Sequence, residues 1–263
     1  MSSIRITVLG SGTSVGVPTI GCGCAVCTSD DPRDKRRRPS VFVSFESDVR
    51  ERNVVIDTTP DFRQQALDAG FKRLDAILYT HSHADHIMGL DDIRPFNYGR
   101  SDRIPVYADS ETLTALKRVF PYGFEELDTH PGGVPRVTGN LIDGQPIRVA
   151  GLDFRPFPVR HGPRTIQAFR FGNAAYITDQ SDIPDESLPF VEGLDVLFLD
   201  ALRHAPHPMH STVERSLGLI EKLKPNRAFF THICHDLPHA ETTAQLPEGV
   251  ELAYDGLVIE VAG

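Results

Sequence analysis

The amino-acid sequence predicts an α/β protein built from layers of strands and helices. Short apolar runs, rich in β-branched and aromatic residues, recur along the 263 residues, and amphipathic stretches of helical character lie between some of them. Four of the apolar runs are followed directly by residues that can bind metal ions. We therefore expect a fold based on sheets, with a functional site at the ends of its strands.

The predicted strands are of two kinds. Residues 4–9 and 41–45 alternate between apolar and polar side chains, which is typical of a strand with one buried face. The others are mostly continuous apolar runs, which suit strands buried on both faces. These runs are residues 53–57, 76–79, 174–177, 196–199, 228–230 and 257–261.

Three segments are predicted to be helices. Residues 61–69 are followed by Gly70, and residues 109–119 begin with the capping pair Asp109 and Ser110. The third helix is expected from Ser211, in the capping-box pattern Ser-Thr-Val-Glu, to about residue 223. Residues 129–144 are rich in glycine and proline and are predicted to form a loop. No linker divides the chain, so residues 1–263 are expected to form a single domain.

Composition excludes some classes of protein. Apolar residues make up 40% and charged residues 24%, as in ordinary globular proteins. The net charge of −9 argues against a nucleic-acid partner, because such a partner requires a basic surface. No run approaches the roughly 18 apolar residues of a membrane span, and the first residues do not resemble a signal peptide. We expect a cytoplasmic protein without a membrane partner.

The strongest signal for chemistry is the cluster His81-Ser-His83-Ala-Asp85-His86. Three of the eleven histidines fall within these six residues, beside an aspartate, and zinc prefers such ligands. In an extended stretch, His81 and His83 point the same way and can bind one ion. A helix that starts after them would redirect Asp85 and His86 toward a second ion.

This cluster resembles the signature of the metallo-β-lactamase superfamily. The resemblance implies a four-layer αββα sandwich with a metal site along one edge, and it implies two catalytic divalent ions. The ligands that it implies are His81, His83 and His161 for one ion, Asp85, His86 and His232 for the other, and Asp179 as the bridge between them. His161 is expected in a loop. The full set of seven ligands is typical of members that act on phosphodiesters, and zinc, manganese and iron all accept it.

A second candidate metal site lies in the glycine-rich loop at about residues 21–28. Cys22, Cys24 and Cys27 supply three thiolates, and a structural zinc needs a fourth ligand. If the chain around residues 231–235 is extended, His235 faces away from the catalytic ions and is favoured as this ligand, with Cys234 as the alternative. The remaining interpretation is three buried apolar cysteines.

The cysteine loop narrows the resemblance to the PhnP group of cyclic phosphodiesterases. It implies hydrolysis of a small phosphate ester by a metal-bound hydroxide, with a ribose cyclic phosphate as one candidate substrate. Catalytic roles are implied for Asp85, Asp179 and His210, and His210 is expected to act as a general acid or hydrogen-bond donor. Relatives of this group imply a homodimer.

Other residues receive supporting roles. Asp57 and Asp200 are expected to orient the ligating histidines. The basic run at residues 33–38 is expected to be a solvated loop, with contact to a substrate phosphate or an acidic partner as the alternative. Gly10 and Gly12 are expected to let the backbone approach the metal centre. In the segment at residues 202–211, His207 is a weaker candidate for catalysis.

Three other functions stay open. An RNA-processing nuclease of the tRNA 3′-end type would share the ligands, but the sequence has no long basic insertion to grip tRNA. A hydrolase of amides, thioesters or lactones is the second. The third is a zinc-stabilised interaction module without activity, which has no reason to keep all seven ligands.

Overall fold

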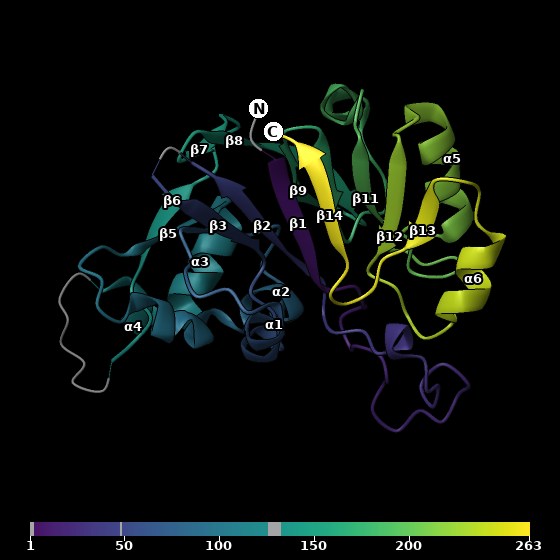
Figure 1. The fold of residues 1–263 in the computed structure, drawn as a ribbon, viewed down its shortest axis with the longest axis horizontal. Helices are drawn as coiled ribbons and strands as arrows, with labels where there is room; N and C mark the ends of the chain where they lie inside the picture. Colours follow the sequence, from purple (N-terminus) through teal and green to yellow (C-terminus); the bar gives the residue numbers. More distant parts are fainter. Residues whose placement is uncertain (1–2, 48, 126–132) are drawn as a thin grey trace.

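Two sheets packed face to face form the centre of the computed structural model, which describes residues 3–47, 49–125 and 133–263 (Figure 1). The first sheet has the order β14 (Val258–Ala262), β1 (Ser3–Gly10), β2 (Ser40–Glu46), β3 (Glu51–Ile56), β4 (Ala76–Leu78), β5 (Ile104–Ala108), β6 (Val137–Leu141). The second has the order β13 (Val250–Leu252), β12 (Arg227–Thr231), β11 (Val196–Asp200), β10 (Ala174–Ile177), β9 (Arg164–Phe171), β8 (Leu152–His161), β7 (Ile147–Val149).

The two sheets share one pattern of strand directions. In the first sheet, β14 to β3 pair antiparallel and β3 to β6 pair parallel. In the second, β7 to β10 pair antiparallel and β10 to β13 pair parallel. The parallel strands β4, β10 and β11 are buried along their whole length, which explains why they are continuous apolar runs.

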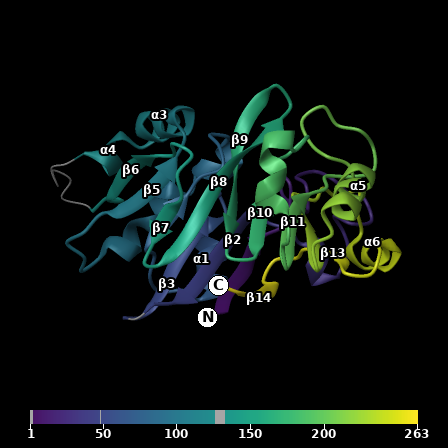
Figure 2. The same ribbon diagram turned by 90° about the horizontal axis from the view of Figure 1, so that it is seen from above.

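Helices cover the outer face of each sheet (Figures 1 and 2). On the first sheet lie α1 (Phe62–Ala69), α2 (Ala84–Ile87), α3 (Ser110–Val119), α4 (Pro121–Phe124) and the 3-10 helix η2 (Leu90–Asn97). On the second lie α5 (Val213–Leu223), α6 (His239–Gln245) and the 3-10 helix η3 (Asp185–Val191). A further 3-10 helix, η1 (Pro32–Asp34), belongs to the N-terminal loop.

Buried apolar residues separate these layers into distinct cores. One core lies between the sheets and includes Ile6 and Phe198, both fully buried. A second joins the first sheet to its helices around Ile77, and a third joins the second sheet to its helices around Phe230. This arrangement is the αββα sandwich, so the predicted fold class is confirmed.

The predicted strands and helices are all present, with boundaries shifted by one or two residues. The interpretation of residues 129–144 as a loop was wrong for β6, while residues 126–132 lie outside the described part. Because β6 is the edge strand, it tolerates Gly139, which a central strand would accept less well. The N-cap of α5 is Thr212, one residue after the expected Ser211, and its hydroxyl accepts a hydrogen bond from the Arg215 amide.

The strands β5 to β9 and β13 were not predicted. Most of them contain polar residues or prolines, and these hide the alternation of apolar and polar side chains that marks a strand. An example is β8, with the sequence Leu-Asp-Phe-Arg-Pro-Phe-Pro-Val-Arg-His. In the described part of the chain, no helix is long and apolar enough to span a membrane.

Candidate metal centre

The strand ends bring most of the predicted ligands together at one edge of the two sheets. Asp57 follows β3, Asp179 lies two residues after β10, and His232 follows β12. Their φ angles are +66°, +58° and +58°, in the left-handed region that residues other than glycine seldom adopt. Such positions cluster at functional sites, because the surrounding structure must hold them there.

The first predicted ligand group is compact. His81 Nε2 lies 2.9 Å from His83 Nδ1, and ligand atoms of His81, His83 and His161 all lie within 4.8 Å of one another. His161 is the last residue of β8, so its expected position in a loop was wrong. A strand end holds the imidazole more firmly than a loop, because the backbone is hydrogen-bonded up to that residue.

The second group converges on Asp179. His86 Nε2 lies 3.2 Å from Asp85 Oδ2 and 3.3 Å from Asp179 Oδ2. His232 Nε2 lies 3.2 Å from the other oxygen, Asp179 Oδ1. The helix α2 begins directly after His83 and turns Asp85 and His86 toward Asp179, while the His86 ring lies 4.1 Å from that of His81. Asp179 therefore presents one oxygen to each of two histidines.

Unpaired nitrogens show that these residues fit a metal ion. Among the described residues, His86 Nε2 and His232 Nε2 are buried and have no hydrogen-bond partner. A buried polar atom without a partner is costly unless something else binds it. Imidazole nitrogens facing carboxylate oxygens at this spacing form the donor set that zinc and similar divalent ions prefer.

Further carboxylates orient the histidines, as predicted. Asp57 Oδ2 lies 2.7 Å from His86 Nδ1 and also accepts a hydrogen bond from the Thr80 hydroxyl. Asp200 Oδ2 lies 3.1 Å from His210 Nδ1 and 3.3 Å from His232 Nδ1. Such contacts fix the ring and direct the other nitrogen toward the site.

The electrostatics of most of the centre suit metal binding. His86 is the exception: burial lowers its pKa, but Asp179, Asp85 and Asp57 outweigh burial and hold this pKa well above its ordinary value. Burial lowers the pKa of His232 to about 3 and lowers that of His81 well below its ordinary value, so both imidazoles are neutral. Burial alone would raise the pKa of Asp179, but the neighbouring His232 and His86 hold it well below its ordinary value. Neutral imidazoles and ionised carboxylates are the forms that bind metals. Burial raises the pKa of Asp200 to about 7.

His210 lies beside both ligand groups. Its ring stacks on that of His232, with centroids 4.4 Å apart, and lies 4.9 Å from that of His161. Because Asp200 occupies Nδ1, Nε2 is the nitrogen left for a substrate. The neighbouring His207 ring lies 5.0 Å from His210, and His204 pairs with Glu214 at the surface.

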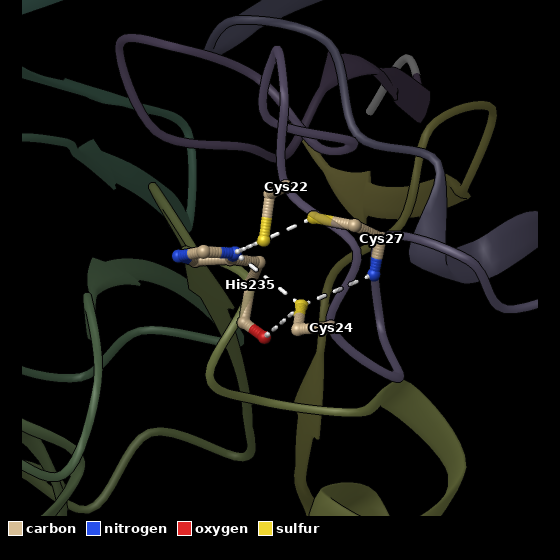
Figure 3. A group of neighbouring side chains, drawn as sticks. All are labelled: Cys22, Cys24, Cys27 and His235. Carbon is tan, nitrogen blue, oxygen red and sulfur yellow. Dashed lines mark hydrogen bonds between the residues drawn. The ribbon is translucent and has the colours of Figure 1, made fainter.

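The predicted zinc ligands of the N-terminal loop also lie together, as Figure 3 shows. The sulfur atoms of Cys22, Cys24 and Cys27 lie 3.3, 3.4 and 3.3 Å from His235 Nδ1. Around a tetrahedral zinc, sulfur and nitrogen ligands stand about 3.5 Å apart, so the four side chains fit this ion. A hydrogen bond from the Cys27 amide lowers the pKa of Cys24 to about 6, which favours the thiolate. The group contains His235 and not the alternative, Cys234.

His235 reaches the cysteines by a different backbone path from the expected one. The chain from His232 to His235 is not extended, because the positive φ of His232 turns the backbone there. The expected role of Gly10 and Gly12 was also wrong. A Cβ atom at Gly10 would lie 2.0 Å from the Arg38 carbonyl oxygen, so the glycines admit the backbone of the basic run and not the metal centre.

The basic run is not simply a solvated loop. Arg36 is buried, and its guanidinium donates to the carbonyl oxygens of Cys234 and Leu237 at 2.7 and 2.6 Å and to Asp34 at 2.9 Å. It therefore supports the backbone on both sides of His235. Sequence reasoning missed this role, because an arginine within a run of charges gives no signal of burial.

The αββα sandwich and its histidine-rich edge define the class of metal-dependent hydrolases with the metallo-β-lactamase fold. A family model described as a beta-lactamase superfamily domain matches residues 52–233, and the chain belongs to this superfamily. A solved structure, a new diphosphatase from the PhnP family, is 53% identical, with a TM-score of 0.91. It covers 99% of this chain, and the chain covers 98% of it. The resemblance to the PhnP group is thereby confirmed.

Curated relatives match a smaller share of their own length. An octanoyltransferase from Porphyromonas gingivalis is 37% identical over 256 residues, which are 97% of this chain and 51% of that protein. A ribonuclease Z from Clostridium acetobutylicum is 29% identical over 154 residues, which are 54% of this chain and 45% of that protein. The chain thus spans about half the length of the curated relatives that it matches.

Proposed function

We propose that the chain is a dinuclear metal-dependent phosphodiesterase that hydrolyses a small phosphate ester, a ribose cyclic phosphate or a diphosphate among them. One observation carries this proposal: Asp179 lies between the two ligand groups, with a ligand atom within 4.8 Å of those of His81 and His161 from the first. Its two oxygens lie 3.3 and 3.2 Å from His86 and His232 of the second. Two relatives support the class of substrate, because a diphosphatase and a ribonuclease both cleave bonds to phosphorus.

The proposed cofactors are two catalytic ions, zinc or manganese, and one structural zinc. His81, His83 and His161 would hold one catalytic ion, Asp85, His86 and His232 the other, and Asp179 both. Two such ions would supply activation of a water molecule and neutralise the charge of a phosphate.

The protein's own residues would complete the reaction. His210, held at Nδ1 by Asp200, would donate a hydrogen bond or a proton from Nε2 to the leaving oxygen. Burial lowers the pKa of His210, but the bond to Asp200 outweighs it and leaves this pKa above its ordinary value. A raised pKa favours the protonated imidazole, which is the form that a general acid requires.

The test is turnover of bis(p-nitrophenyl) phosphate with added zinc or manganese. Asp179→Ala should lower kcat/KM by about 10³-fold or more, because it removes the shared ligand and thus several kcal/mol of stabilisation. The matched control is Asp182→Ala, three residues away and exposed, which should leave turnover unchanged. No wild-type turnover above that of Asp179→Ala would contradict the proposal.

The same assay separates the other functions. Preferred cleavage of a precursor tRNA would favour a processing nuclease, and preferred turnover of a thioester or lactone would favour that class of hydrolase. Absence of all activity, with one zinc per chain, would indicate an interaction module. The homodimer and the single domain stay predictions, which light scattering and limited proteolysis can test.

A further inference from the structure

A buried serine interrupts the apolar face of helix α5. The helix packs Val213, Leu217 and Ile220 against the second sheet, at the spacing of one helical face, and Ser216 lies on this same face. Ser216 is completely buried, although serine is mostly found at the surface of proteins. A buried hydroxyl is costly unless it is hydrogen-bonded, so its partners indicate why a serine occupies this position.

Both partners of the Ser216 hydroxyl adjoin the proposed general acid. Its Oγ lies 2.6 Å from the carbonyl oxygen of Asp200 and 2.8 Å from Oγ of Ser211, the residue after His210. A carbonyl oxygen can only accept a hydrogen bond, and each hydroxyl carries one hydrogen. Ser216 therefore donates to the Asp200 carbonyl and accepts from Ser211.

These hydrogen bonds join two separate segments that form the acid pair. Asp200 is the last residue of β11, whereas His210 lies just before the N-cap of α5. The two side chains meet with Oδ2 3.1 Å from Nδ1. Ser216 is fixed in the helix and holds the backbone of Asp200 on one side and the neighbour of His210 on the other.

Backbone hydrogen bonds also hold this region. The Ser211 amide donates to the Gln180 carbonyl, and the Ser211 carbonyl accepts from the Leu202 amide. Neither bond involves Ser216, so both remain when its hydroxyl is removed. The local fold should therefore survive a substitution of Ser216, while the distance between Asp200 and His210 becomes less well fixed.

We propose that Ser216 is a positioning residue, which sets Asp200 and His210 relative to each other and keeps Nε2 of His210 directed at the leaving oxygen. This inference rests on the proposed function. Proton transfer requires the acid within hydrogen-bond reach of its acceptor, and a small displacement costs much of the rate. The effect is greatest for a leaving group that departs poorly without a proton.

Two substrates that differ in the leaving group test this role. Methyl p-nitrophenyl phosphate releases a phenolate that needs little help from an acid, and methyl phenyl phosphate releases one that needs more. Ser216→Ala should lower kcat about tenfold for the phenyl ester and less than about threefold for the nitrophenyl ester, with KM for both within about twofold. A purely structural loss would lower both rates by the same factor.

The matched control is Ser187→Ala. Ser187 is equally buried, and its hydroxyl donates to the Pro158 carbonyl of β8 at 2.5 Å. Its removal should not change the ratio of the two rates. Ser211→Ala leaves the bond from Ser216 to Asp200 in place, so it should change the ratio in the same direction by a smaller factor. This variant carries the test if Ser216→Ala does not fold.

A double variant and a spectroscopic measurement show whether Ser216 acts through His210. In the His210→Ala background, Ser216→Ala should not change the ratio further, because the group that it positions is gone. In proton NMR spectra, the Nδ1 proton of His210 should exchange with water faster in Ser216→Ala than in wild type.

Three results would overturn the inference. They are an unchanged ratio in Ser216→Ala and Ser211→Ala, an equal change in Ser187→Ala, and a further change in the His210→Ala background. If wild-type protein turns over neither ester nor bis(p-nitrophenyl) phosphate, the proposed function itself fails.

Discussion

Single residues with unusual backbone angles determine where the metal ligands point. Among the described residues other than glycine, Asp57, Ala150, Asp179, Lys224 and His232 have positive φ, and three of these five lie in the candidate centre. Aspartate and histidine occur at such angles more often than most residues, but each position still costs about 1–3 kcal/mol. The sequence around His232 gives no indication of that angle, because the pairing of distant strands imposes it.

Asp255 is a half-buried carboxylate that supports the centre from a distance. Its oxygens accept hydrogen bonds from the Ser11 amide and hydroxyl and from the Arg37 amide. The Ser11 carbonyl in turn accepts from the Ile233 amide, next to His232. Burial raises the pKa of Asp255 to about 6.

We predict a pH-dependent contribution from Asp255 to stability. Its pKa is about 6 in the folded protein and roughly 3.9 in the unfolded chain, so the folded state binds the proton more tightly. Its contribution is fully present below about pH 4 and is lost as pH rises through about 6. The free energy of unfolding of wild type relative to Asp255→Asn should therefore fall by roughly 2–3 kcal/mol between pH 4 and pH 8. Denaturant titrations of both proteins measure this, and a constant difference would contradict it.

The N-terminal loop and the segment after β12 form one structural unit. Gly12 bridges Ile233 in a parallel pair, and the amide of Thr13 donates to the Ile233 carbonyl. Arg36 joins the same segment through Cys234 and Leu237. These contacts connect the N-terminal loop to the strand that carries His232, and they do not depend on a bound metal ion.

We predict that Arg36→Met destabilises the protein by about 3–5 kcal/mol. The substitution leaves the carbonyls of Cys234 and Leu237 without this donor and the buried Asp34 carboxylate with only the His239 amide, and removing one partner of a buried ion pair is costly. Arg33→Met, a control in the same run, breaks an exposed pair with Asp31 and should cost less than about 1 kcal/mol. Similar losses for both variants in urea unfolding would show that Arg36 has no special role.

Strands and helices with a regular pattern of apolar residues could be predicted from the sequence. Elements and residues whose form or role depends on tertiary contacts could not. The strands that precede Asp179 and His232 were clear, because burial makes them mostly apolar. β8 was missed because its prolines and arginines obscure the alternation of a strand. The cluster His81–His86 stood out in the sequence and the resemblance to the superfamily implied the other candidate ligands, whereas Arg36 gained its role from tertiary contacts alone.

The edge that carries the candidate metal centre joins two halves of similar topology, each built around one sheet. The first sheet supplies Asp57, His81 and the residues of α2, and the second supplies His161, Asp179 and His232. Each half presents the ends of its parallel strands to the shared edge. Neither half holds a complete ligand set, so metal binding should couple the two sheets.

Removal of the proposed structural zinc should lower both the metal content and the stability of the protein. Cys22→Ser should reduce the metal content of replete protein from about three ions per chain to two, because the tetrahedral site loses a ligand. Stability should fall, since a structural zinc contributes folding free energy. The contacts of Gly12 and Arg36 remain, so the protein should stay folded with a lowered Tm, by roughly 2–4 °C for each kcal/mol lost.

Metal analysis and calorimetry of Cys22→Ser and Cys234→Ser distinguish this site from ordinary burial of cysteines. Cys234 is buried next to His235 but lies outside the ligand group, so Cys234→Ser should keep three ions. Because the Cys22 loop is tied to Ile233, loss of its zinc should also loosen His232 and lower occupancy of the catalytic ions at limiting metal. An unchanged metal content in Cys22→Ser, or an equal loss in Cys234→Ser, would contradict the assignment of the four ligands.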